Sequence, residues 1–283
     1  MERKTIPQIA GEKERRLVML TAYDYWTSQL VDRAGADMIL VGDSLGMVIQ
    51  GHPNTLGVSV DDIVYHTRAV IRGRTNALVV GDMPYMSYHI SIPETIQHAG
   101  RIIREGGADA VKLEGGRKRL PMIQALLDAE IPVMGHLGLT PQSINKFGGF
   151  KVQGKGLRER KELKADALAL EEAGVFAIVL ECVPYDLARE VSELLTIPTI
   201  GIGAGPYTNG QVLVIHDLLG MNFERTPKFV RPYSEFGASG LEAVSAFCND
   251  VREGNFPSMA ESFGTAKKRQ NKPKLVVEKK QAR

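Results

Sequence analysis

Short apolar runs alternate with amphipathic segments along most of the chain. Runs of four to eight mainly apolar residues predict buried strands, and apolar residues spaced three and four apart predict helices. Seven strands are expected on this basis, at residues 16–23, 38–41, 77–82, 110–114, 132–137, 177–181 and 198–202. An eighth is expected at residues 228–233, where the pattern is weakest, and the apolar stretch 211–219 is expected to form a short helix.

Helical segments are expected between the strands. Ser59 and Ser91 are candidate N-caps, and Gly35 and Gly174 are candidate stops. A glycine-rich loop at residues 138–156 interrupts the alternation and is expected to act as a lid or partner contact. The expected helices cover residues 25–34, 59–72, 91–105, 118–129, 159–172, 185–195 and 240–252.

Three of the expected strands end in an acidic residue, and a fourth is followed by one after a single glycine. Related segments, AGADMILVGD, GGADAVKLE and AGVFAIVLE, repeat a glycine, a turn, a strand and an acid. Such alternation predicts an α/β protein, a (β/α)₈ TIM barrel whose functional groups gather at the carboxyl ends of the strands. A doubly wound open sheet is the competing fold, but it would not readily bring these acids together. The acids are Asp43, Asp82, Glu114 and Glu181.

Asp43, Asp82 and Glu114 are candidate ligands of Mg²⁺, which prefers oxygen donors. Each acid alone could equally cap a helix or pair with a basic residue, but four in equivalent positions favour a shared cation. Lys112 lies two residues before Glu114, so both side chains point to the same face of their strand. A lysine there can bind a substrate carboxylate, or simply balance charge.

Three further residues are candidates at the same end of the strands. Glu181 follows four apolar residues and is a candidate general base, with a salt bridge as the alternative. His136 is a candidate substrate or metal-shell contact, although a single histidine is more often structural. Ser44 could bind a carbonyl or carboxylate, or act only as a turn hydroxyl.

Composition limits the classes of function. The 283 residues carry a net charge of +2 and only two cysteines, Cys182 and Cys248. Nucleic acid is therefore not an expected partner, and a reducing cytoplasm is the expected location. No apolar run is long enough to span a membrane, and no export signal is expected. Residues 1–264 are expected to form one domain, followed by a basic, disordered tail at 265–283.

Seven motifs carry a family resemblance. In order they are LTAYD, VGDSLG, GDMPY, VKLEGG, GHLGLTPQ, LECVP and IPTIGIGAG. With these motifs the chain closely resembles the ketopantoate hydroxymethyltransferase (3-methyl-2-oxobutanoate hydroxymethyltransferase) family, from about residue 5 to about residue 256.

The resemblance implies a phosphoenolpyruvate-mutase-like (β/α)₈ barrel and a cytoplasmic homo-oligomer, commonly a decamer. It implies that Asp43, Asp82 and Glu114 surround Mg²⁺, that Ser44, Asp82 and Lys112 contact the oxo acid, and that Glu181 accepts the proton. The implied reaction, a step of pantothenate synthesis, transfers a hydroxymethyl group from 5,10-methylenetetrahydrofolate to 3-methyl-2-oxobutanoate through a Mg-stabilised enolate. Its products are 2-dehydropantoate and tetrahydrofolate.

Two other functions remain open at this point. One is a Mg²⁺-dependent lyase or mutase of the same barrel group acting on a 2-oxo acid. Such lyases are expected to use a reactive loop cysteine, and Cys182 is a poor candidate because strand alternation points it away from the interior. The other is a metal-binding or scaffold protein without catalysis, which would not require Lys112 and Glu181 beside the acids.

Overall fold

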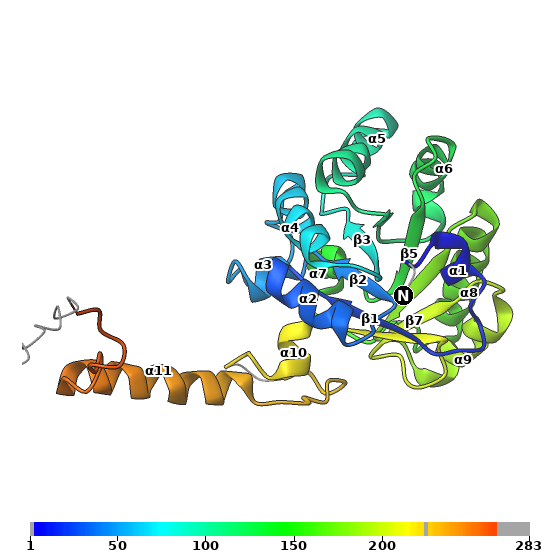
Figure 1. Ribbon diagram of the computed structural model, residues 1–283. Helices are drawn as coiled ribbons and strands as arrows, with labels where there is room; N and C mark the ends of the chain where they lie inside the picture. Colours follow the sequence, from blue (N-terminus) through cyan, green and yellow to red (C-terminus); the bar gives the residue numbers. More distant parts are fainter. Residues whose placement is uncertain (1–2, 224–225, 265–283) are drawn as a thin grey trace, which may run out of the picture. The chain divides into compact units, whose positions relative to one another are not determined.

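Eight parallel strands form a closed barrel, as predicted. The structure is a computed structural model and describes residues 3–223 and 226–264. Each strand pairs with the next one along the chain, and the last pairs with the first (Figure 1). The strands are β1 (Leu17–Thr21), β2 (Met38–Val41), β3 (Leu78–Asp82), β4 (Ala110–Lys112), β5 (Val133–Gly138), β6 (Ala177–Glu181), β7 (Thr199–Ile202) and β8 (Gly210–Leu213).

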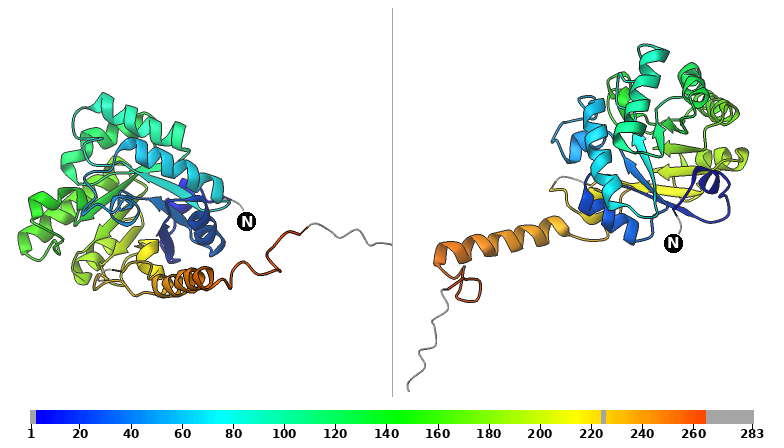
Figure 2. Two further views of the ribbon diagram at one scale, coloured as in Figure 1. Left: turned by 90° about the vertical axis from the view of Figure 1, so that its left-hand side faces the viewer. Right: turned by 45° about the horizontal axis from the view of Figure 1, so that its top comes forward.

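Helices surround the strands (Figure 2). Ser59 and Ser91 are N-caps, as predicted, since their side chains accept hydrogen bonds from the backbone N–H groups of Asp62 and Glu94. The helices of the barrel unit are α1 (Ile6–Ala10), α2 (Tyr25–Arg33), α3 (Leu45–Val48), α4 (Val60–Gly73), α5 (Ile92–Arg101), α6 (Leu120–Asp128), α7 (Ile144–Phe147), α8 (Leu157–Ala173), α9 (Tyr185–Leu194) and α10 (Ile215–Leu219).

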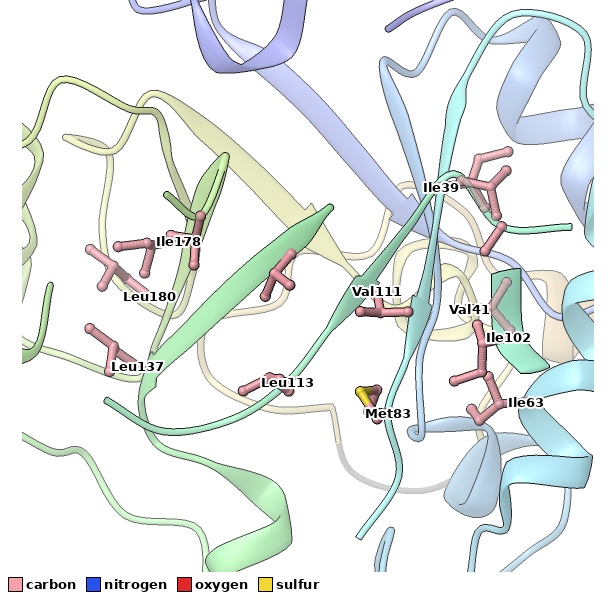
Figure 3. Close-up of a cluster of buried hydrophobic side chains, with 14 of the residues drawn as sticks. Ile39, Val41, Ile63, Met83, Ile102, Val111, Leu113, Leu137, Ile178 and Leu180 are labelled. Atoms are coloured by element: carbon pink, nitrogen blue, oxygen red, sulfur yellow. The ribbon is translucent and has the colours of Figure 1, made fainter. Parts of the chain in front are cut away.

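Alternate residues of the strands build two apolar layers. Side chains such as Met19 and Leu78 fill the barrel interior. Their neighbours face the helices, where Val41 lies with Ile63 and Ile102 (Figure 3). A barrel filled in this way is a packed core, so a ligand site can open only above the interior layers.

The eighth strand was predicted in the wrong place. β8 pairs with β1 through Leu17↔Gly210 and with β7 through Ile200↔Gly210, which closes the barrel. The stretch 211–219, expected to be one helix, is instead divided at Val214, whose extended backbone separates β8 from α10. Four residues are too few for their alternation to be distinguished from a helix start, and pairing on both edges stabilises them as a strand.

The described chain divides into two compact units. One ends at Gly237 and contains the barrel, and the other begins at Ala238. The second unit contains most of α11 (Phe236–Glu253), none of whose side chains is buried. The domain boundary predicted at residue 264 stays a prediction, and the tail at 265–283 lies outside the described residues. No helix among the described residues is long and apolar enough to cross a membrane.

Candidate active site

The barrel's interior positions become polar at the carboxyl ends of the strands. On β3 the inward residues Leu78 and Val80 are followed by Asp82, and on β5 Met134 is followed by His136. The register then determines which side chains meet, because Asp82 of β3 is paired with Lys112 of β4. The same alternation that fills the core therefore delivers charged groups to the top of the barrel.

Lys112 lies among the carboxylates. Its Nζ is 2.8 Å from Asp82 Oδ1, and both side chains are under 5% exposed, at 4% and 2%. Burial disfavours the ammonium, but the charges of Asp82, Glu114 and Asp43 outweigh it and raise the pKa of Lys112. Lys112 is therefore a positive charge held at a buried position, suited to binding an anion.

The described cationic side chains do not fully balance the negative charge of the buried carboxylates. Burial, together with repulsion from Asp82 and Glu114, raises the pKa of Asp43 well above its usual range. Burial also raises the pKa of Asp82, although Lys112 opposes this shift. Glu114 Oε1 is buried without a hydrogen-bond donor in the described part of the chain, and His136 Nδ1 lies 3.5 Å from it. These acids fit a further cation better than they fit the described side chains alone.

The acids are not arranged as a complete metal site. Within residues 3–223 and 226–264, no three His, Cys, Asp or Glu side chains form a set that could hold an ion. The oxygens instead contact protein donors, such as Lys112 at Asp82 and the Gln142 amide, whose Nε2 lies 2.9 Å from Asp43 Oδ2. The chemistry of the donors suits Mg²⁺, and binding would require them to exchange these partners.

His136 lies between two acids. Its Nδ1 is 3.5 Å from Glu114 Oε1, and its Nε2 is 3.3 Å from Glu181 Oε2. Burial and Lys112 disfavour the charged imidazole, but Glu114 and Glu181 outweigh them and raise the pKa of His136 to about 9. At neutral pH His136 is therefore cationic and holds the Glu181 carboxylate in place.

All seven predicted site residues line one cavity of about 880 Å³. Ser44 hydrogen-bonds through Oγ to the hydroxyl of Tyr23 at 2.8 Å. The Glu181 side chain is 15% exposed, more than Glu114 at 3%. Glu181 therefore has more access to the cavity than the deeper acid. The residues are Asp43, Ser44, Asp82, Lys112, Glu114, His136 and Glu181.

Comparison with known proteins identifies the family. The model of the family described as ketopantoate hydroxymethyltransferase matches residues 3–259. The chain belongs to this family. The 3-methyl-2-oxobutanoate hydroxymethyltransferase of Moorella thermoacetica is 55% identical over 263 residues, which cover 92% of this chain and 98% of that relative. The enzyme of the same name from Syntrophomonas wolfei is 55% identical over 265 residues, covering 93% and 96%.

Solved structures support the fold of this ketopantoate hydroxymethyltransferase family member. Phosphoenolpyruvate phosphomutase from Streptomyces platensis aligns with a TM-score of 0.58 at 15% identity, covering 89% of this chain and 88% of that one. Phosphonopyruvate hydrolase, solved with oxalate and Mg²⁺, aligns with a TM-score of 0.59 at 14% identity, covering 91% and 93%. At such identity the likeness establishes the phosphoenolpyruvate-mutase-like barrel alone.

Gln142 is a site residue that the sequence did not single out. It lies in a turn after β5, η3 (Pro141–Ser143), and is 5% exposed. Its Nε2 donates to Asp43, its Oε1 accepts from the Tyr88 hydroxyl at 2.6 Å, and its backbone N–H donates to Glu114 Oε2 at 3.1 Å. Gln142 thus donates hydrogen bonds to two acids, Asp43 after β2 and Glu114 after β4. It lay within the GHLGLTPQ motif, but nothing local distinguishes it from a loop glutamine.

Replacing Gln142 with Ala is expected to lower the free energy of unfolding by about 1–3 kcal/mol, because the buried Asp43 and Tyr88 oxygens lose partners. Urea unfolding followed by circular dichroism measures the change. The matched control is Gln124→Ala, on the exposed side of α6, where the side chain donates a hydrogen bond to Asp128. If the two variants were equally stable, the hydrogen bonds of Gln142 would not stabilise the fold.

Cys182 was wrongly expected to face away from the interior. It follows β6 directly and lines the cavity, because its positive φ of 46° ends the strand alternation. Burial, with the charge of Glu181, raises the pKa of its thiol to about 12. The thiol therefore stays protonated at neutral pH, which makes Cys182 a poor nucleophile for lyase chemistry.

Proposed function

We propose that this chain transfers a hydroxymethyl group from 5,10-methylenetetrahydrofolate to 3-methyl-2-oxobutanoate, giving 2-dehydropantoate and tetrahydrofolate. The relatives at 55% identity bear the name of this activity. The observation that carries the proposal is one cavity in which Lys112, three buried carboxylates and Glu181 converge. To remove a proton beside the carbonyl of a 2-oxo acid, an enzyme needs a cation that binds the acid and a second, separate carboxylate that accepts the proton. Lys112 and Glu181 can fill these two roles.

Mg²⁺ is the metal that we propose for the site. Asp43, Asp82 and Glu114 would hold it, and it would supply positive charge that stabilises an enolate. The support lies in the raised carboxyl pKa values of Asp43 and Asp82 and in the buried Glu114 Oε1, which has no hydrogen-bond donor among the described residues. Five acidic side chains line the cavity, Asp43, Asp82, Glu114, Glu181 and Asp217, and Lys112 is the only Lys or Arg among the described residues that line it.

The chain's own residues divide the remaining work. Lys112 binds the carboxylate of the oxo acid, and Ser44 and Asp82 orient it. Glu181 takes the C3 proton, and His136 keeps its carboxylate directed at the substrate. The electron pair left at C3 then forms a bond to the methylene carbon of the folate, and the two bonds from that carbon to nitrogen break. Water supplies the hydroxyl group, and the proton removed from C3 and the remaining proton of water are the two that the folate nitrogens gain as tetrahydrofolate is released.

Proton NMR of 3-methyl-2-oxobutanoate in D₂O tests both half-reactions and the need for metal. With purified protein and Mg²⁺, the C3 proton signal is expected to disappear, and EDTA is expected to prevent this loss. A hydroxymethyl product is expected only after methylenetetrahydrofolate is added. Folded protein that gave neither exchange nor product would contradict the proposal and direct attention to a lyase or mutase acting on another 2-oxo acid.

We also propose a cytoplasmic homo-oligomer, with a decamer as the expected size. Unit two supports assembly because α11 and the segment after it leave large apolar side chains exposed, which a monomer rarely does. These are Leu241, Val244, Phe247, Val251, Phe256 and Met259. Both cysteines are free, which suits a reducing compartment. Light scattering after gel filtration gives the mass, and a monomer would contradict the proposal.

A further inference from the structure

The cavity is larger than the small oxo acid requires. Pockets of 300–1,000 Å³ typically hold drug-sized ligands, and this one is about 880 Å³. The acids and Lys112 occupy the side formed by β2 to β6. The opposite side is formed by β8, α10 and the residues after them, including Val212, Val214 and Met221. A second, mostly apolar ligand surface therefore faces the acid cluster.

Asp217 is a carboxylate within this apolar wall. It lies in α10, lines the cavity and is half-buried. Its Oδ1 accepts a hydrogen bond from Asn222 Nδ2 at 2.5 Å. No Lys, Arg or His of residues 3–223 and 226–264 forms an ion pair with it, unlike Asp82 with Lys112. Burial raises its pKa, although the Asn222 bond opposes the shift. Asp217 can therefore accept further hydrogen bonds, and a ligand in the cavity can provide the donors.

Phe229 adds a flat aromatic surface to the same cavity. Its ring lies over Gly203, where an added Cβ would be 3.1 Å from two ring carbons. Gly203 has a φ of 62°, in the left-handed region that favours glycine, and the Phe229 ring packs against the backbone at this position. The cavity thus offers a carboxylate and an aromatic face together, which suits a flat heterocycle with adjacent N–H donors.

We propose that Asp217 binds the pterin ring of the folate co-substrate and that Phe229 lies against one face of that ring. The inference rests on the proposed function. The pterin presents its N3–H and 2-amino groups on one edge, and this pair of donors matches the two oxygens of a carboxylate. The glutamate tail of the folate carries negative charge, which Asp217 would repel, so the ring end is the part that fits.

The test is steady-state kinetics of the full-length Asp217→Asn variant with Mg²⁺ and saturating oxo acid. The KM for methylenetetrahydrofolate is expected to rise on the order of 10- to 100-fold, since the variant loses a charge-assisted hydrogen bond. Exchange of the C3 proton, which needs no folate, is expected to persist and to report a folded site. Asp128→Asn on α6, remote from the cavity, is the matched control and is expected to leave both quantities unchanged.

Two inhibitors, each equivalent to one end of the folate, then show which end Asp217 binds. Inhibition by 6-methyltetrahydropterin is expected to weaken in Asp217→Asn, whereas inhibition by p-aminobenzoylglutamate is not. An unchanged KM, or unchanged inhibition by the pterin, would overturn the inference. So would a loss of C3 exchange in proportion to transfer, because Asp217 would then serve the oxo acid or the fold. If the unmodified protein transfers no hydroxymethyl group, it is the proposed function that fails.

Discussion

The Glu181→Gln variant is expected to lose C3 proton exchange by a factor on the order of 10² to 10⁴, the usual contribution of a positioned general base. The amide has the size of the carboxylate and can stay near His136, whose Nε2 lies 3.3 Å from Glu181 Oε2. It cannot accept the proton. NMR in D₂O measures exchange, and calorimetric titration with Mg²⁺ and oxo acid is expected to show that binding survives.

Glu193→Gln is the control for this variant. Glu193 lies on the exposed surface of α9, away from the cavity, so the same change there is expected to leave exchange intact. Exchange that survived in Glu181→Gln would exclude Glu181 as the base. His136 and the remaining acids of the cavity would then be the next candidates to replace.

Replacing Lys112 with Met is expected to reduce both activity and stability. Removing one partner of a buried ion pair leaves the other uncompensated and costs about 3–5 kcal/mol. Asp82 is the closest such partner, 2.8 Å away. Binding of the oxo acid is expected to weaken as well, because its carboxylate would lose the ammonium group of Lys112. Urea unfolding measures the stability, and calorimetry measures the binding.

A second substitution separates these two effects. Adding Asp82→Asn to Lys112→Met removes the orphaned charge, so part of the stability is expected to return while activity stays absent. Lys118→Met, on the exposed turn η2 (Arg117–Arg119), is the control and is expected to change neither. If Lys112→Met were as stable as the unmodified chain, Lys112 would not be the charge that holds the acids together.

Local sequence predicted most of the elements because each carries its own signal. Ser59 and Ser91 cap helices with their own side chains, and apolar runs such as residues 77–82 bury both faces of a strand. β8 had no such signal, because what makes it a strand is pairing with β1 and β7. The composition of residues 228–233 predicts a strand, but the segment forms none, and Phe229 lines the cavity.

The sequence by itself determined the barrel fold, the family and the seven residues that share the cavity. It could do so because strand alternation places the last inward residue of each strand at one end of the barrel. Only the tertiary structure decided which groups touch: the ion pair of Lys112 with Asp82, the position of His136 between two acids, and the bonds of Gln142. These contacts join residues from different strands and loops, so they depend on the register of the closed barrel, which no local pattern encodes.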